Sequence, residues 1–341
     1  MSGRADERTR GGVRSTLSFG EMAHTSPPRS GDLGTARIEL PLRGPGGEPV
    51  DLWRTLVSHG FHDLPPLAID GDARSLDVTL RVPRGKPRRI RISTGGRTRA
   101  VVEVLGGPAV SASTRAALAA GAARVLHLDH DLSGFYAKAA GDPDLAWVRA
   151  GAGRMLRSQT VFEDVVKTLC TTNCSWALTT KMVDALVREL GEPAAGHGRD
   201  PLSNAFPSAT AMAARDEGFY RQVVRSGYRA PSFVTLSRLV AEGAVDLETL
   251  GDSSREDLPD ADVERQLLAL PGIGPYAAAH VMMTLGRNSR LILDSWTRPT
   301  YAKLVGRKTP PPDRTIERRF LRYGEDAGLA FWLFVTRDWV A

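Results

Sequence analysis

The stretch LPGIGPYAAAH, residues 270–280, decides how this chain is interpreted. Gly272 and Gly274 let the backbone turn tightly and approach another molecule closely, because neither carries a Cβ atom. Pro275 suits the first position of a helix, where its missing N–H costs nothing. The stretch therefore predicts a helix over 275–285 that is preceded by a tight glycine turn and ended by Gly286.

The glycine turn joins this helix to an earlier one, which we expect at 262–269. Backbone amides at the N-terminus of the second helix are exposed and can bind a phosphate group. We therefore identify Pro271, Gly272, Ile273 and Gly274 as candidate phosphate-binding residues. The alternative is a structural corner in which the glycines only make the turn.

A single carboxylate, Asp294, follows the apolar run LIL at residues 291–293. It is a candidate catalytic residue, and it is also a candidate N-cap, because Asp is favoured there and Ser-Trp-Thr follows. The two roles are compatible, since a carboxylate at the positive end of a helix stays ionised. Pro299 would fall one turn into a helix that started at Asp294, so we expect a kink or a later start.

The composition is that of a water-soluble globular protein, and its basic charge balance favours an anionic partner without identifying one. The 341 residues are 42% hydrophobic, and 45 Lys+Arg against 39 Asp+Glu give a net charge of +6. This length predicts two or three domains. The sequence contains no apolar run long enough to span a bilayer and no signal-peptide core, so we expect a cytoplasmic protein with no membrane contact.

The two cysteines, Cys170 and Cys174, lie one helical turn apart in an apolar segment. Helical geometry disfavours a disulfide between them, so they are expected to be reduced core thiols. No further Cys or His lies at ligand spacing around the pair, which argues against a structural metal and against an iron–sulfur cluster.

The organisation along the chain predicts an α+β protein. Residues 1–30 are rich in Gly, Ser, Arg and Pro and are expected to form a disordered basic tail. Residues 31–125 alternate apolar and polar side chains and are expected to form an antiparallel β-sheet domain, with one helix at 51–57. The expected strands contain residues 38–40, 76–82, 89–92 and 101–105.

Residues 126–341 are expected to form an all-α, two-lobed body, because apolar residues there recur at helical spacing. The expected helices, besides the pair around the glycine turn, contain residues 161–170, 177–190, 208–215 and 231–242.

The segment from Leu270 to Asp294 resembles the helix-hairpin-helix signature of the HhH-GPD superfamily of DNA glycosylases. Asp294 lies 20 residues beyond Gly274, where that superfamily places its catalytic aspartate. The resemblance implies that Asp294 stabilises the positive charge that develops on the sugar when an N-glycosidic bond breaks, and that it orients or deprotonates the attacking water.

Members of this superfamily that also cut the strand carry a lysine two residues after the second hairpin glycine, and its amine forms a Schiff base. This chain has Tyr276 there, and a phenol cannot form an imine. The resemblance therefore implies a hydrolytic, monofunctional enzyme without AP-lyase activity. Lys303, more than two helical turns beyond Asp294, is a poor substitute.

The residues from Arg154 to Trp176 resemble the 8-oxoguanine glycosylase branch. In that branch an asparagine fills the space left by the flipped base, and here it would be Asn173. Tyr228 would wedge between bases, and Arg229 and Arg157 would bond to the estranged base. Without the resemblance, Asn173 could equally be a helix cap, and a Tyr-Arg pair is more often part of an ordinary surface.

The chain departs from that branch in its base pocket. His280 lies at a pocket position that holds cysteine in the branch, and Phe331 aligns with a base-reading glutamine. With Tyr276 and Trp296 these residues form the candidate base pocket. The changes argue against a simple 8-oxoguanine specificity, and an aromatic pocket would suit an alkylated, electron-poor base. The alternative for Phe331, Trp332 and Phe334 is plain core packing at helical spacing.

The sequence thus predicts a base-excision-repair glycosylase that acts as a monomer on double-stranded DNA with a damaged or mismatched base. No cofactor is expected, apart from a possible monovalent cation at the hairpin that the resemblance implies. One alternative is a catalytically inactive helix-hairpin-helix module that only binds DNA. A small-molecule glycosidase or a helical scaffold is the remaining alternative, although we find no second catalytic carboxylate and no cofactor motif.

Overall fold

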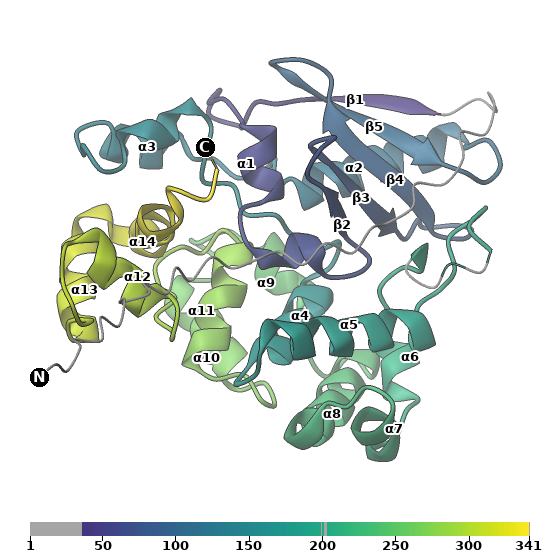
Figure 1. Ribbon diagram of the computed structural model, residues 1–341. Helices are drawn as coiled ribbons and strands as arrows, with labels where there is room; N and C mark the ends of the chain where they lie inside the picture. The colour runs from purple at the N-terminus through teal and green to yellow at the C-terminus, as the bar shows by residue number, and fades with distance from the viewer. Residues whose placement is uncertain (1–35, 199, 201–202, 341) are drawn as a thin grey trace, which may run out of the picture. The chain divides into compact units, whose positions relative to one another are not determined.

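The structure, a computed structural model, describes residues 36–198, 200 and 203–340, and shows a mixed α+β protein (Figure 1). The tail predicted at residues 1–30 lies outside the described residues. Five antiparallel strands form one sheet in the order β1-β5-β4-β3-β2. The strands are β1 (Arg37–Pro41), β2 (Ala68–Asp70), β3 (Ser75–Leu80), β4 (Arg88–Thr94) and β5 (Arg99–Leu105). The predicted antiparallel sheet is confirmed, and β2 is an edge strand that the sequence pattern did not reveal.

One face of the sheet is covered by α2 (Ala112–Val125), whose buried side chains join the apolar residues of the central strands in one hydrophobic cluster. The register places Ile92 opposite Val102, as the alternation of apolar and polar residues in both strands requires. The expected helix α1 (Leu52–Leu56) begins after Asp51, whose carboxylate accepts the Arg54 amide. This cap explains why the helix starts there.

Beyond the sheet the chain is helical, as predicted. The predicted helices are found within a few residues of their expected bounds, and Gly286 ends the helix that follows the glycine turn, in the left-handed conformation with φ 76°. The helices are α3 (Ser133–Ala139), α4 (Val161–Thr171), α5 (Trp176–Leu190), α6 (Ala209–Ala213), α7 (Glu217–Gln222), α8 (Ala230–Ala241), α9 (Glu248–Asp252), α10 (Asp260–Leu268), α11 (Pro275–Thr284), α12 (Thr297–Leu304), α13 (Asp313–Phe320) and α14 (Ala327–Thr336).

Helix α11 is shared by two hydrophobic clusters of the helical body. Ala278 and Val281 pack with α4, α5, α8 and α10, whereas Ala279 and Met283 pack with α3, α12, α13 and α14. Every residue from Ala277 to Thr284 is consequently buried. The N-terminus of α11 and the loop after it are therefore anchored from both sides. Within the described part of the chain, no helix is long and apolar enough to cross a membrane.

Candidate functional site

The turn between α10 and α11 has the geometry that its two glycines require. Gly272 has φ 79°, in the left-handed region that side chains avoid. A Cβ atom there would lie 2.8 Å from the Leu169 side chain and 2.8 Å from the Ser232 hydroxyl oxygen. Gly272 is thus needed for the turn and for its close packing on α4 and α8.

Gly274 serves a different purpose, because a Cβ atom there would meet no heavy atom within 4 Å among the described residues. Its residue is exposed, and α11 begins directly after it with Pro275, without a side chain that caps the first turn. Ile273, by contrast, is buried and anchors the turn in the core. The open side of this turn can therefore receive another molecule.

Asp294 lies in the loop between α11 and α12 and is half-buried. Its Oδ1 accepts the backbone amides of Trp296 at 2.8 Å and Thr297 at 2.6 Å, so it does cap the start of the next helix. That helix, α12, starts at Thr297, and Pro299 falls in its first turn, where its missing donor costs little. The later helix start expected from Pro299 is confirmed.

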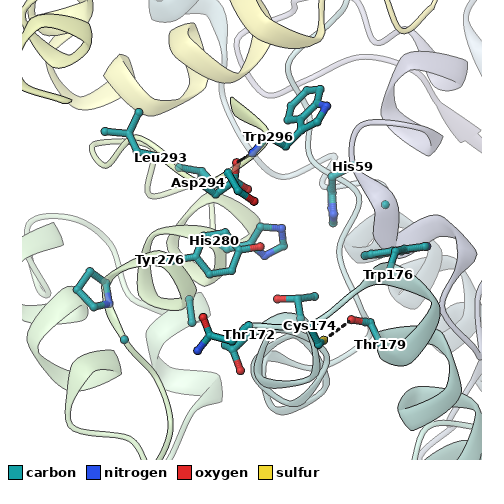
Figure 2. Close-up of a pocket in the computed structure, with 18 of the residues that line it drawn as sticks. His59, Thr172, Cys174, Trp176, Thr179, Tyr276, His280, Leu293, Asp294 and Trp296 are labelled. Carbon is teal, nitrogen blue, oxygen red and sulfur yellow. Dashed lines mark hydrogen bonds between the residues drawn. The ribbon is translucent and has the colours of Figure 1, made fainter. Parts of the chain in front are cut away.

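Asp294 lines a cavity with a volume of about 1110 Å³. The same cavity is lined by Gly272, Gly274 and Tyr276, so the glycine turn and the carboxylate belong to one site. Figure 2 shows Asp294 and Trp296 on one side of the cavity, with Tyr276 and His280 beside them and Thr172 and Cys174 across from them. These residues come from α11, the α4–α5 turn and the loop before α12.

Tyr276 and His280 lie one turn apart on α11 and both face the cavity, as predicted for the base pocket. Burial raises the pKa of the Tyr276 phenol, although a hydrogen bond with the Thr171 side chain acts in the opposite direction, and the Asp294 carboxylate adds a smaller rise. The phenol therefore stays protonated at neutral pH. Burial lowers the pKa of His280 to about 4, although Asp294 acts in the opposite direction. At neutral pH the His280 imidazole is therefore uncharged.

Two aromatic rings of the cavity come from a part of the chain that the sequence did not connect with the site. His59 and Phe61 lie after α1, and their rings pack against His280 with centroid distances of 5.5 and 4.9 Å. No local motif marks them, because they are brought to α11 only by the packing of the sheet domain against the helical body.

Tryptophans form much of the remaining wall. Trp296, Trp332 and Trp339 contact one another with ring centroids 5.2 to 6.1 Å apart, and Trp176 faces the cavity from the start of α5. Trp296 was predicted as a pocket residue, and the structure places it there. Trp176 immediately follows the motif around Asn173, and this proximity was the signal that could have identified it.

Asn173 and Tyr228 meet at the rim of the cavity. Asn173 occupies the α4–α5 turn with φ 46° and is exposed, and its Nδ2 donates to the Tyr228 hydroxyl at 3.2 Å. Tyr228 is 61% exposed. Arg229 is buried: its Nε donates to the Thr172 hydroxyl at 3.0 Å, and its guanidinium lies 4.6 Å from the centre of the Tyr228 ring. Arg229 thus supports Tyr228 from beneath.

Two predicted site residues do not reach the cavity. Arg157 is 2% exposed and lies within 4.0 Å of the Asp129 carboxylate, so its position does not support the predicted contact with a base. Phe331 is fully buried, with its ring 5.5 Å from that of Phe320. Consecutive residues on α14 point about 100° apart, so Trp332 faces the cavity while Phe331 faces the core. The core alternative was therefore correct for Phe331.

The thiols are unpaired, as expected for reduced cysteines. Cys170 is buried, whereas Cys174 lines the cavity and donates to the Cys170 carbonyl oxygen at 3.0 Å. Among residues 36–340 that the structure describes, no group of three or more His, Cys, Asp or Glu side chains is placed to hold a metal ion. The monovalent cation at the turn stays a prediction.

Comparison with known proteins identifies the fold. No family model matches the sequence, and no curated protein matches it. Among solved structures, the chain is similar to a 3-methyladenine DNA glycosylase from Archaeoglobus fulgidus, with 20% identity and a TM-score of 0.65, over 90% of this chain and 100% of that one.

Two further structures show the same likeness. MBOgg1 in complex with a low-affinity DNA ligand is 18% identical, with a TM-score of 0.65, over 89% of this chain and 96% of that one. An 8-oxoguanine glycosylase/lyase from Clostridium acetobutylicum, in complex with double-stranded DNA, is 18% identical, with a TM-score of 0.56, over 76% and 87%. The chain therefore has the fold of these DNA glycosylases.

Proposed function

We propose that this protein is a DNA glycosylase of base excision repair, which binds duplex DNA as a monomer and removes a damaged or mismatched base. The observation that carries the proposal is that the Asp294 carboxylate lies on the wall of an aromatic cavity that also contains the glycine turn. A volume of about 1110 Å³ is ample for one nucleotide. The glycosylase fold supports the same function.

Asp294 is the proposed catalytic residue. Its Oδ1 is occupied by the amides of Trp296 and Thr297, and these bonds fix the carboxylate in one orientation. Among the described residues, Oδ2 has no hydrogen-bond partner and is free to face the sugar. A fixed carboxylate stabilises the oxocarbenium-like charge that develops as the glycosidic bond breaks, and it can orient the attacking water.

The rim residues support a base-flipping step. Asn173 and Tyr228 are exposed, bonded to each other, and placed at the mouth of the cavity. A short amide and an aromatic ring at this point can enter the duplex and fill the space that a flipped nucleotide leaves. Arg229 stabilises the wedge through its contact with the Tyr228 ring.

The turn at Gly272–Gly274 is the proposed phosphate contact, because its amide groups precede α11 and its outer side is open. The proposed reaction is hydrolytic and leaves an abasic site. Tyr276 occupies the position of the lyase lysine, and the residues that line the cavity include no lysine.

The excised base is proposed to be electron-poor, such as an alkylated purine. Trp176, Trp296 and Trp332 supply aromatic faces around the cavity, and cationic rings gain free energy from such faces. Neutral His280 adds no competing positive charge.

The function is tested with duplexes that carry single lesions, namely 3-methyladenine, 8-oxoguanine, uracil or mismatched thymine, followed by alkaline cleavage of abasic sites. Excision of at least one base, without strand cleavage before alkali, is expected. Duplex binding without excision of any lesion would instead support the inactive DNA-binding module.

A further inference from the structure

His59 lines the cavity and is buried, yet one of its two ring nitrogens, Nδ1, has no hydrogen-bond partner among the described residues. It is 1% exposed and lines the cavity from the segment after α1. Its neighbour Ser58 accepts the Trp332 indole N–H with its carbonyl and the Leu156 amide with its hydroxyl, at 2.9 and 2.8 Å. The His59 backbone is thus held firmly against both the cavity wall and the helical body.

The tautomer of His59 follows from its contacts. Nε2 lies 2.7 Å from the Leu156 carbonyl oxygen, which can only accept, so Nε2 carries the hydrogen. Burial lowers the pKa of His59 to about 3, and the ring is neutral at physiological pH. Nδ1 consequently presents a lone pair.

That lone pair has no donor among the described residues, although Nδ1 is buried. Buried polar atoms are nearly always bonded, and each exception needs an explanation. Figure 2 shows the His59 ring between Trp296 and Trp176, in the lining of the cavity. Because His59 lines the cavity, a ligand bound there can supply the missing donor once a small movement of the neighbouring side chains uncovers Nδ1.

His280 offers a second acceptor beside it, because the two rings lie 5.5 Å apart between centroids. The Thr168 hydroxyl donates to the Asp164 carbonyl at 2.7 Å, so it can only accept from His280 Nδ1, which lies 3.4 Å away. The hydrogen of neutral His280 is then on Nδ1, and Nε2 carries the lone pair.

The threonines of the cavity also lack free donors. The hydroxyls of Thr171, Thr172 and Thr179 each donate to a backbone carbonyl of α4, at 2.7, 2.9 and 3.1 Å. Together with the histidines and the Asp294 carboxylate, they leave this part of the cavity rich in acceptors. A base that approaches His59 and His280 meets two ring acceptors, so it gains a hydrogen bond there only by offering an N–H group.

We infer that His59 selects the base: its Nδ1 accepts a hydrogen bond from an amino group or ring N–H, and a base without such a donor at that edge is rejected. The inference rests on the proposed function and deepens it, because it assigns the substrate class to bases with a hydrogen-bond donor at the edge facing His59. A carbonyl there would oppose two lone pairs and leave both without a donor, so we expect at least about tenfold discrimination.

The test uses two variants, each of which keeps only one of the two hydrogen-bonding groups of the imidazole. In His59→Gln the amide nitrogen lies near the position of Nε2, so the bond to Leu156 is kept and the Nδ1 acceptor is lost. In His59→Asn the amide oxygen lies near the position of Nδ1, so the acceptor is kept and the bond to Leu156 is lost. Thermal melting of both variants reports the loss of stability separately.

The probes are free adenine and free purine, which differ only in the 6-amino group, titrated into 15N-histidine-labelled protein and followed by NMR. We expect adenine to shift the His59 Nδ1 resonance and to bind at least about tenfold more tightly than purine. His59→Gln should abolish this preference and His59→Asn should retain it. Equal affinities in the wild type, binding of neither base, or an unchanged preference in His59→Gln would overturn the inference.

The binding experiment does not depend on catalysis, so its failure is distinguishable from failure of the proposed function. If the protein excises a lesion but binds the two free bases equally, the role of His59 is wrong and the glycosylase function stands. A preference for adenine without excision of any lesion would count against the glycosylase activity and leave the role of His59 intact.

Discussion

Asp294 and Thr297 are bonded to each other in both directions. The Thr297 amide donates to Asp294 Oδ1 at 2.6 Å, and the Asp294 amide donates to the Thr297 hydroxyl oxygen at 2.8 Å. Thr297 itself is completely buried. The proposed catalytic carboxylate is therefore also the residue that fixes the start of α12, so its structural and chemical roles must be separated by the choice of substitution.

Asp294→Asn makes that separation. The amide oxygen of asparagine can still accept the Trp296 and Thr297 amides, so melting temperature and duplex binding should stay close to those of the wild type. Excision should fall by at least about a hundredfold, because the negative charge is lost. Single-turnover excision and thermal melting measure the two effects.

The matched control for this substitution is Asp313→Asn, which removes a carboxylate paired with Arg298 at 2.7 Å outside the cavity. An exposed pair of this kind contributes about 0–1 kcal/mol. Activity should be unchanged. Wild-type excision by Asp294→Asn would refute the assigned mechanism.

Thr297 is predicted to be a positioning residue. Thr297→Val keeps the shape of the side chain but leaves the Asp294 amide without its acceptor, which should cost about 1–3 kcal/mol of unfolding free energy. Excision should slow about tenfold with little change in duplex affinity, because the carboxylate is less well oriented. Thr297→Ser, which retains the hydroxyl, should restore both; if it does not, the hydroxyl is not the cause.

The two glycines of the turn should respond differently to alanine. Gly272→Ala must place a Cβ 2.8 Å from Leu169 and Ser232 at positive φ, so it should lower the free energy of unfolding by more than about 1 kcal/mol. Gly274→Ala has open space and φ −99°, so stability should be unaffected.

A phosphate held against the turn would nevertheless meet the new methyl group of Gly274→Ala. Duplex affinity should therefore fall several-fold in this variant, as measured by fluorescence anisotropy. Full affinity in a stable Gly274→Ala protein would mean that the phosphate does not contact this side of the turn.

The protein is predicted to lack lyase activity because position 276 carries a tyrosine. The wild type should give no covalent adduct with abasic DNA in the presence of borohydride, because a phenol forms no imine. Tyr276→Lys should give a trapped adduct, since burial at this position favours a neutral amine. Tyr276→Phe should give none and serves as the control. An adduct with the wild-type protein would contradict a purely hydrolytic mechanism.

Stability should fall on mild acidification because several imidazoles are buried without charge. The pKa values of His59, His130 and His280 are lowered to about 3, 4 and 4, so the unfolded chain binds more protons than the native one between about pH 6.5 and 4. Each imidazole then lowers the unfolding free energy by about 1.4 kcal/mol per pH unit as pH decreases. Asp164, with its pKa raised to about 6 by burial, acts in the opposite direction below that pH.

Denaturant unfolding between pH 7 and pH 5 measures this slope. His59→Gln removes one of the imidazoles and should reduce the slope by about 1 kcal/mol per pH unit averaged over this range, because the unfolded imidazole is only partly protonated near pH 7. An identical pH dependence in this variant would show that His59 is already protonated or is solvated in the native protein.

Local sequence was sufficient to predict those structural elements that a few neighbouring residues specify. The glycine turn, Pro275 and Gly286 defined α11 to within one residue, because turn geometry and helix ends depend on local dihedral angles. The resemblance placed Asp294 and Tyr276, and the structure brings both to one cavity. Alternation likewise predicted the sheet, although β2, with three residues, was too short to give a pattern.

The content of the pocket was decided by tertiary structure. Which of Phe331 and Trp332 faces the cavity depends on the rotation of α14 against its neighbours, and an entirely apolar helix carries no amphipathic signal that would fix this rotation. Arg157 matched a motif, yet packing buries it away from the cavity. His59 and Phe61 join Asp294 only through long-range packing, which no local pattern encodes. The sequence by itself thus determined the turn, the carboxylate, the missing amine and two pocket residues on nearby segments, His280 and Trp296. Only the fold brought His59, Phe61 and Trp339 to the same cavity, because these residues are distant from the motif in sequence.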